Sequence, residues 1–264
     1  METLNLKQIL IPYAQAVEEL KLKFKSIRYE YLSLDEYSPI EFVTGRVKKI
    51  SSILDKANKK NIPLTQIEEK IEDIAGIRIM CQFEEDINKV IELVRNRHNK
   101  DLVIIEERDY ITNMKASGYR SYHIIVSYPI QTAMGERIVL AEIQIRTLAM
   151  NFWATIEHSL RYKYKQNMPE SIQERLNNAA QAAYKLDLEM AQIREEVLKA
   201  QKGFQTQSNT VGNIFANIHS LAKVLGEQEM NPIYEKFWKL WEEDSVEQMR
   251  EFNVSLEELL REKR

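Results

Sequence analysis

The chain has 264 residues, of which 44% are hydrophobic and 29% charged, with seven glycines and one cysteine. No two glycines have the spacing of a dinucleotide-binding motif or a P-loop, and a single cysteine excludes a disulfide framework and a thiolate metal site. No apolar run approaches the roughly 20 residues that span a bilayer. We therefore expect a soluble, cytoplasmic protein without a membrane partner, which holds any phosphate with side chains rather than a glycine-rich loop.

Charge is unevenly distributed along the chain, whose formal net charge is -3. Residues 43–60 carry six basic residues and one aspartate, whereas residues 203–264 carry 7 basic and 11 acidic residues. A basic cluster in an otherwise neutral chain favours a local site for a polyanion. The pattern predicts a main domain over residues 1–202 and an acidic, mainly helical extension over residues 203–264.

Hydrophobic periodicity predicts the elements in chain order. We expect helices over 4–32 and 46–60, a strand over 75–83, a helix over 84–97, strands over 102–106, 119–128 and 137–146, and helices over 148–165 and 170–202. The short connection Met134-Gly135-Glu136 favours an antiparallel hairpin between the last two strands. Gly203 is expected to end the last helix, followed by a polar linker over 203–212 and further helices. The fold class is α/β, with a mixed sheet of about four or five strands flanked by helices.

The helix expected over 46–60 has two different faces at 100° per residue. The polar face carries three lysines and a hydroxyl: Lys48, Ser52, Lys56 and Lys59. The opposite, packed face carries Val47, Ile50, Leu54 and Ala57. The lysine face is as compatible with ordinary solvation as with phosphate binding, and periodicity alone does not decide between them.

The strands carry polar side chains on one face, because alternate residues of a strand point the same way. The side chains expected together on this face are Arg78, Tyr119, His123, Glu142 and Gln144, with Arg146 two residues after Gln144. A sheet face exposed to water explains this pattern in the simplest way. The mixture of carboxylate, arginine, histidine and tyrosine also suits a divalent metal and a polyphosphate, since Mg²⁺ is usually held by one or two carboxylates plus phosphate oxygens.

Other residues have simpler interpretations. Cys81 is expected to be a buried thiol. Glu157 and His158 lack the H-E-x-x-H spacing of a zinc helix. Trp238 and Trp241 are expected to pack in a core or to contact a partner helix.

Five segments resemble the synthetase domain of the RelA/SpoT alarmone synthetases, and above all the small synthetases of the RelQ type. They are residues 13–28, 38–57, 72–83, 107–126 and 142–164, and GYRSYH (118–123) and EIQIRTLAMNFWATIEH (142–158) are the most specific runs. The resemblance covers residues 10–202 and implies a fold related to nucleotidyltransferases. It implies a GTP pyrophosphokinase that transfers the β,γ-pyrophosphate of ATP to the 3′-hydroxyl of GDP or GTP, giving AMP and ppGpp or pppGpp.

The resemblance also implies residue roles. Arg46 and Arg78 would sandwich the adenine of ATP, and its phosphates would be bound by Lys48, Ser52, Lys56, Lys59 and Arg108. Lys59 stands where the family often has arginine, so its role is less secure than that of Lys56. Asp73 and Glu142 would bind Mg²⁺, and Glu142 would also take the proton of the acceptor hydroxyl. Tyr119 would stack on guanine, and the other GDP or GTP contacts would come from Lys115, His123, Gln144 and Asn151.

A second implied feature is a homotetramer with a central cleft that binds pppGpp as an activator. The matching positions are Lys21, Lys25, Glu41, Phe42 and Thr44, with a possible contribution from Asn151. Without the resemblance, Lys21 and Lys25 would be interpreted as a solvated helix edge. The chain contains no His-Asp dipeptide, so we expect synthesis without alarmone hydrolysis.

Two alternatives remain open at this point. The basic surfaces could bind single-stranded RNA in a regulatory protein, in which case binding should depend strongly on salt. A catalytically inactive scaffold acting through its C-terminal extension is the other alternative, although the complete set of Asp73, Tyr119, His123 and Glu142 argues against it.

Overall fold

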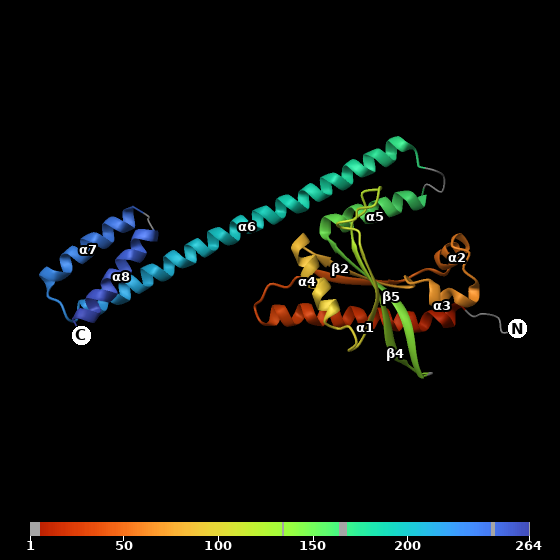
Figure 1. Cartoon of the computed structure of the whole chain (residues 1–264), viewed down its shortest axis with the longest axis horizontal. Coiled ribbons are helices and arrows are strands. Elements are labelled where there is room, and N and C mark those ends of the chain that lie inside the picture. The colour runs from red at the N-terminus through yellow and green to blue at the C-terminus, as the bar shows by residue number, and fades with distance from the viewer. Residues whose placement is uncertain (1–5, 134, 164–167, 244–245, 264) are drawn as a thin grey trace. The chain divides into compact units, whose positions relative to one another are not determined.

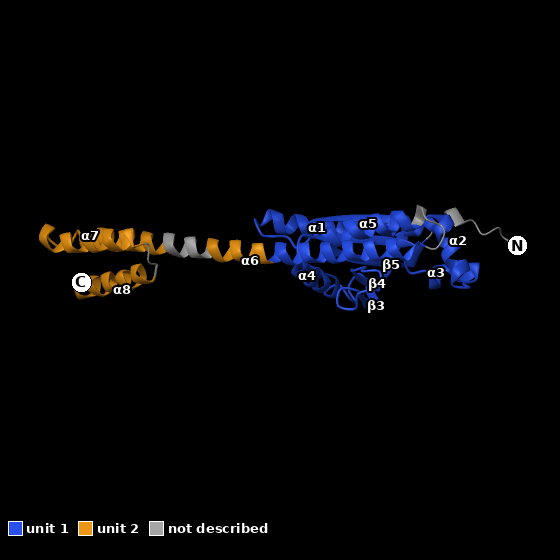
Figure 2. Cartoon of the chain, turned by 90° about the horizontal axis from the view of Figure 1, so that it is seen from above, with its two compact units in different colours: residues 1–191 blue, residues 192–264 orange. Residues whose placement is uncertain are grey.

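The computed structural model describes residues 6–133, 135–163, 168–243 and 246–263 (Figure 1). The chain divides into two compact units, residues 1–191 and residues 192–264 (Figure 2). The elements are α1 (Leu6–Ser33), β1 (Phe42–Val47), α2 (Ile50–Lys59), a 3-10 turn (Leu64–Gln66), α3 (Ile67–Lys70), β2 (Ala75–Cys81), α4 (Glu84–Arg95), β3 (Val103–Asp109), β4 (Tyr122–Thr132), β5 (Gly135–Thr147), α5 (Leu148–Lys163), α6 (Glu170–Leu221), α7 (Glu227–Glu242) and α8 (Val246–Glu262). Among the described helices, none combines the length and apolar character that crossing a membrane requires.

A five-stranded sheet organises the first unit, in the order β1-β2-β5-β4-β3. The two central strands β2 and β5 are parallel, and every other neighbouring pair is antiparallel. The predicted mixed sheet and the antiparallel hairpin of β4 and β5 are therefore confirmed. Met134, in the predicted connection of that hairpin, lies outside the described residues.

One face of this sheet is apolar and carries the main core. Side chains of Ile77, Ile143 and Ile145 on the central strands are fully buried, together with Phe24 of α1 and Val90 of α4. Because strand side chains alternate between the two faces, the intervening polar residues of β2 and β5 point to the other side of the sheet. Cys81 is also fully buried, as expected.

The helix expected over 46–60 begins later than predicted, so that prediction is wrong in its first residues. Arg46 and Val47 belong to β1, where they pair with Gly76 and Ala75, and Lys48 lies between the strand and α2. A stretch with helical periodicity can still complete a sheet edge, since backbone pairing and packing override local preference.

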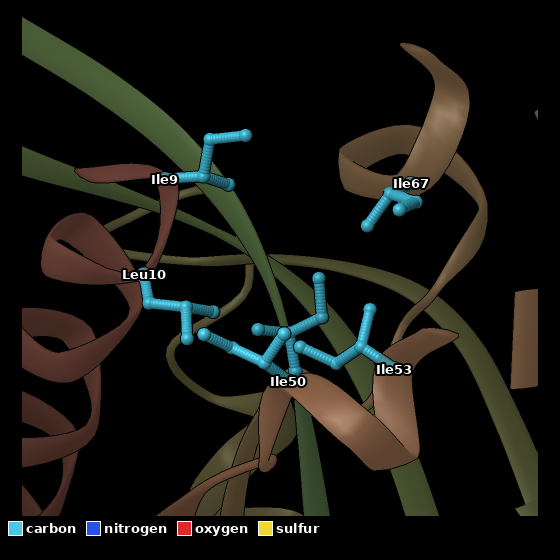
Figure 3. Close-up of a pocket in the computed structure, with 6 residues that line it drawn as sticks. Ile9, Leu10, Ile50, Ile53 and Ile67 are labelled. Carbon is cyan, nitrogen blue, oxygen red and sulfur yellow. The ribbon is translucent and has the colours of Figure 1, made fainter. Parts of the chain in front are cut away.

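The packed face of α2 also differs from the expectation. Ile50 and Ile53 point toward Ile9 and Leu10 of α1 and toward Ile67 of α3, around a cavity of about 10 Å³ (Figure 3). Ile53 is 2% exposed, whereas Leu54, which was expected on this face, is 36% exposed. Ile53 is therefore the residue that anchors α2.

The expected helix end at Gly203 is wrong, because α6 continues through the predicted linker to Leu221. A glycine inside a helix costs only about 1 kcal/mol. Ile214, Ile218 and Leu221 lie beyond it on the same helix and are almost fully buried, which favours continuing the helix.

Helices α7 and α8 share an apolar core with the C-terminal part of α6 in the second unit. Its buried members are Ile214, Ile218, Leu221, Met230, Phe237, Leu240, Met249, Phe252 and Leu256. At the start of α7, the Gly226 amide donates to the Glu229 carboxylate at 3.2 Å. Every described secondary-structure element of this unit is a helix, and residues 222–226 form the turn between α6 and α7.

Candidate active site

A row of polar residues crosses the sheet on the face opposite the main core. In the strand register, Thr44 pairs with Arg78, Arg78 with Gln144, Gln144 with His123, and His123 with Arg108. Side chains of directly paired residues share a face. Glu142 lies two residues before Gln144 on β5, so it joins the same face, and the predicted gathering of these side chains is confirmed.

A chain of hydrogen bonds links the central members of this row. Tyr119 Oη lies 2.8 Å from His123 Nε2, and His123 Nδ1 lies 2.9 Å from Glu142 Oε1. Gln144 Nε2 donates to Glu142 Oε2 at 2.5 Å. The sequence predicted Tyr119 inside the strand, but β4 begins only at Tyr122. The Tyr119 hydroxyl nevertheless reaches the histidine. Both oxygens of the Glu142 carboxylate are therefore held in place.

The surroundings of Glu142 keep its carboxylate ionised. Burial, at 8% exposure, would raise the pKa, but the hydrogen bonds from His123 and Gln144 outweigh it and leave the pKa below its ordinary value. Such bonds stabilise the charged form. At neutral pH, Glu142 is thus an acceptor for a proton or a ligand for a cation.

Arg146 is the main site residue that sequence reasoning left without a role. Its side chain donates to Tyr119 Oη at 2.5 Å, to Gln144 Oε1 at 2.7 Å and to Ser121 Oγ at 3.1 Å, and the residue is 4% exposed. It therefore joins the loop before β4 to the end of β5. The signal that could have found it was alternation, because Glu142, Gln144 and Arg146 follow one another on one face.

Two lysines converge on Asp73, just before β2. Lys48 Nζ lies 2.7 Å from Asp73 Oδ2, and Lys56 Nζ lies 2.8 Å from Asp73 Oδ1. Burial raises the pKa of Asp73, but the bonds from the two lysines outweigh it and hold that pKa below its ordinary value. The structure thus brings Lys48 and Lys56 together although only Lys56 lies on α2.

The other predicted residues on α2 are less constrained. Ser52 is partly buried and Lys59 is exposed. Within the described ranges, no hydrogen bond or ion pair connects Lys59 with the Asp73 group.

Two arginines lie on the neighbouring strands β1 and β2. Burial lowers the pKa of Arg78 to about 10, with the positive charges of Arg146 and Arg46 adding to the effect. The Arg78 Nε donates to Gln144 Oε1 at 3.2 Å. The pKa of His158 on α5 is lowered by partial burial and then by the positive charges of Arg46 and Arg78. His158 is therefore within electrostatic reach of this pair. Sequence reasoning considered His158 only as a zinc ligand.

Lys115 and Arg108 flank the site on the side of β3 and the following loop. Lys115 Nζ lies 4.1 Å from the ring centroid of Tyr110 and 5.1 Å from that of Tyr119. Burial lowers the pKa of Lys115, against the charge of Glu142. Arg108 bonds Glu72 at 2.9 Å and Glu106 at 2.5 Å, so in this state its guanidinium is already occupied by two carboxylates.

Asn151 occupies a different element from the rest of the predicted acceptor site. It lies on α5, and its Oδ1 is buried without a hydrogen-bond partner in the part of the chain that the structure describes. A buried amide oxygen of this kind is available to a ligand donor.

The five residues expected in a pppGpp cleft lie on α1, on the edge strand β1 and just before it. Lys21 packs on β1 at Gly45, where an added Cβ would lie 2.7 Å from the lysine Cδ. Phe42 and Thr44 alternate with Gly45 and so point to the opposite side of the strand. Lys25 is exposed on α1, and Glu41 accepts a hydrogen bond from Gln82 at 2.7 Å. A cleft assembled from several copies stays a prediction.

Asp73 and Glu142 are the residues that could hold a divalent cation. The charge of Asp73 raises the pKa of Glu142, although the net shift is downward, so the two carboxylates lie within electrostatic reach. No cluster of three or more potential metal-ligating residues occurs among the described residues. Two carboxylates completed by phosphate oxygens are the usual protein contribution to a Mg²⁺ site, and the donor set therefore fits this ion.

The arrangement defines a class of protein: an α/β enzyme whose sheet face combines a buried carboxylate, a second carboxylate and several cationic side chains, a set that suits phosphorylated ligands. The family model described as "Region found in RelA / SpoT proteins" matches residues 45–167. The chain is 58% identical over 204 residues to GTP pyrophosphokinase YjbM of Bacillus subtilis, covering 77% of this chain and 95% of the relative. It is 39% identical to GTP pyrophosphokinase YwaC of the same organism, covering 72% and 91%.

Solved structures of small alarmone synthetases have the same fold as this chain. The small alarmone synthetase 1 of B. subtilis bound to its product pppGpp matches with a TM-score of 0.69 and 59% identity, over 73% of this chain and 97% of that chain. Its complex with AMPCPP matches with a TM-score of 0.64 and 54% identity, over 74% and 98%. The chain belongs to the RelA/SpoT family and has the fold of the small alarmone synthetases, as its sequence motifs had predicted.

Proposed function

We propose that the chain is a GTP pyrophosphokinase that transfers the β,γ-pyrophosphate of ATP to the 3′-hydroxyl of GDP or GTP, with AMP as the other product. The observation that carries this proposal is the connected group Tyr119–His123–Glu142–Gln144, which holds an ionised carboxylate on the polar face of the sheet. Relatives named as GTP pyrophosphokinases and the fold shared with a pppGpp-bound synthetase support the same activity.

The acceptor nucleotide is assigned to the side of the site around Tyr119. Its ring offers a stacking surface for guanine, and Lys115 lies 5.1 Å from the centroid of that ring, where an ammonium group can meet a phosphate. Glu142 accepts the proton of the 3′-hydroxyl. His123 orients this carboxylate, and Gln144 and Asn151 offer polar atoms to the guanosine.

The donor nucleotide is assigned to the side around Asp73. Arg46 and Arg78 lie on adjacent strands and provide planar cations for the adenine. Lys48 and Lys56 are in place for the triphosphate, with Ser52, Lys59 and Arg108 completing the proposed set. Since both substrates are strongly anionic, positioning and charge neutralisation are the main contributions that the protein makes to phosphoryl-type transfer.

Asp73 and Glu142 would hold Mg²⁺ together with the donor phosphates. When bound, the ion would neutralise charge that develops on the transferred group. Lys48 and Lys56, which now bond Asp73, would then turn toward phosphate oxygens.

The direct test is incubation of the purified chain with ATP, Mg²⁺ and either GDP or GTP. We expect AMP and a 3′-pyrophosphorylated guanosine nucleotide in equal amounts, and none without Mg²⁺. Hydrolysis of ATP without transfer to the guanosine nucleotide would contradict the proposal.

The same proposal makes finer predictions about hydrolysis, assembly and regulation, and RNA binding is the alternative function. We expect no release of pyrophosphate from added ppGpp in the presence of Mn²⁺. We expect a homotetramer in the cytoplasm whose initial rate rises with added pppGpp, and a flat response would overturn this regulation. If the chain instead serves to bind single-stranded RNA, binding would fall steeply with salt and would not require Glu142.

A further inference from the structure

Helix α7 has an exposed aromatic side next to its buried side. Phe237 and Leu240 point into the core of the second unit at 2% and 8% exposure. Tyr234, Trp238 and Trp241 are 41%, 56% and 47% exposed, and at 100° per residue they form one stripe along the helix. We call this stripe, together with Phe215 of α6, the aromatic face.

The aromatic face is continuous across two helices. The Phe215 ring, 52% exposed, packs edge-on against Phe237 with centroids 5.1 Å apart. The Phe237 ring also contacts Trp238 at 5.3 Å and Trp241 at 6.1 Å. The buried Phe237 ring therefore contacts three of the exposed rings, those of Phe215, Trp238 and Trp241, and holds them in one surface.

The size of this face is that of the largest apolar patch on a typical soluble protein. An aromatic side chain presents about 150–250 Å², so four that are about half exposed leave roughly 300–500 Å² of apolar surface open. Patches of this size on soluble proteins are often functional. Tryptophan and tyrosine are also the residues that most often carry binding energy at protein interfaces.

The outer edge of the face is acidic. Glu235 and Glu242 flank the aromatic stripe of α7 on the side away from the core, and Glu227 lies at the N-terminal end of the stripe. All three are exposed, and none forms an ion pair among the described residues. Of the two lysines of α7, Lys239 is on the same side as this edge, four residues after Glu235, and lies beside Glu243 at 4.0 Å. Lys236 Nζ lies over the ring of Phe252 at 5.2 Å.

This charge pattern selects among possible occupants. Nucleic acid and anionic lipid would be repelled by three carboxylates at the edge of the face. A second copy would present the same acidic edge, with no excess of basic residues to pair with it, because a two-fold interface uses the same patch on both copies. A positively charged, partly apolar partner gains both burial of the rings and cation–π contacts of lysine or arginine with the indoles.

We propose that the aromatic face is a docking surface for a basic amphipathic helix of a partner protein. The ridge of Trp238 and Trp241 on α7 and the ring of Phe215 on α6 receive the apolar side of that helix. Glu227, Glu235 and Glu242 meet its basic residues. Docking of a helix between two helices is a common mode of peptide recognition, and this function is independent of the proposed synthetase activity.

The test uses the full chain and a fluorescent synthetic helix of about five turns, with leucine and phenylalanine on one side and lysine on the other. A second peptide has the same apolar side with every lysine replaced by glutamate. We expect saturable binding of the lysine peptide, measured by fluorescence anisotropy, and binding of the glutamate peptide that is at least about tenfold weaker. Equal binding of the two peptides, or no binding of the lysine peptide, would overturn the proposal.

Two sets of variants locate the binding. Trp238→Ala combined with Trp241→Ala is expected to weaken binding of the lysine peptide at least about tenfold, whereas Val254→Ala, at a 52% exposed position on α8, is expected to leave it unchanged. Glu235→Lys with Glu242→Lys is expected to reverse the preference toward the glutamate peptide, whereas Glu258→Lys on α8 is not. Circular dichroism verifies that each variant retains its helices.

Sedimentation velocity addresses the second-copy alternative. We expect the wild-type chain and the double tryptophan variant to have the same mass in solution. A lower mass for the variant would assign the aromatic face to contacts between copies of this chain and overturn the proposal, as would peptide binding that the tryptophan variant retains.

Discussion

The candidate functional surfaces of the two units are built in different ways. In the first unit, the functional carboxylates are held by partners: Glu142 by His123 and Gln144, and Asp73 by Lys48 and Lys56. In the second unit, the aromatic face leaves large rings such as Trp238 about half exposed. Preorganised charge is the feature of a site that acts on small ions and nucleotides, whereas exposed rings with an acidic edge suit association with another protein.

The largest expected effect in this comparison comes from Glu142→Gln. The substitution keeps the shape of the side chain but removes the charge and the proton acceptor, so the rate of AMP release should fall by about 10²–10⁴-fold. Thermal unfolding should remain cooperative, which shows that the fold is intact. Turnover near the wild-type value with normal dependence on Mg²⁺ would remove Glu142 from the proposed mechanism.

Arg146→Lys should have the next largest effect. Lysine cannot keep the arrangement in which one guanidinium bonds Tyr119, Gln144 and Ser121 together. We expect kcat/KM for GDP to fall by roughly tenfold to a hundredfold, with a smaller change for ATP. Arg137→Lys, on the exposed part of β5, is the matched control. An equal loss for both nucleotides would indicate a general structural role for Arg146.

The ion pairs of Asp73 predict a dependence of stability on pH. Its pKa in the folded chain is lowered from the ordinary value of 3.8, so the stabilisation is present above that ordinary value and is lost as pH falls through the lowered one. Chemical unfolding at a series of acidic pH values should show a shallower decline for Asp73→Asn than for the wild-type chain. Asp55→Asn, at an exposed position on α2, should leave the slope unchanged. An unchanged slope for Asp73→Asn would mean that these pairs do not stabilise the fold.

The smallest expected effect is that of the double tryptophan substitution on synthesis. Trp238 and Trp241 contact Phe237 of the same helix, so removing them should change the rate of AMP release by less than about twofold, as for most surface substitutions. A large loss of synthesis in this variant would show that the two units are coupled, and the contrast between them would no longer hold.

Prediction from sequence succeeded where periodicity and chemistry coincided. Alternation along 137–146 placed Glu142 and Gln144 on one face, and the strand register confirms it. Prediction from sequence was less successful at the ends of helices and strands. Arg46 lies on a strand because it pairs with Gly76 across the sheet edge, a contact between residues far apart in the chain. The helix through Gly203 similarly depends on packing that follows it, at Ile214 and Ile218.

The sequence by itself determined the family, the α/β class and most of the residues of the polar face, because motifs and two-residue alternation are local properties. Tertiary structure decided which partners each side chain has: Lys48 and Lys56 meet at Asp73 from different elements, and Arg146 ties Tyr119 to Gln144. It also decided between core and surface for the tryptophans, since only the packing of α7 determines that Phe237 is buried while Trp238 is exposed. These outcomes depend on contacts between distant residues, which local periodicity does not contain.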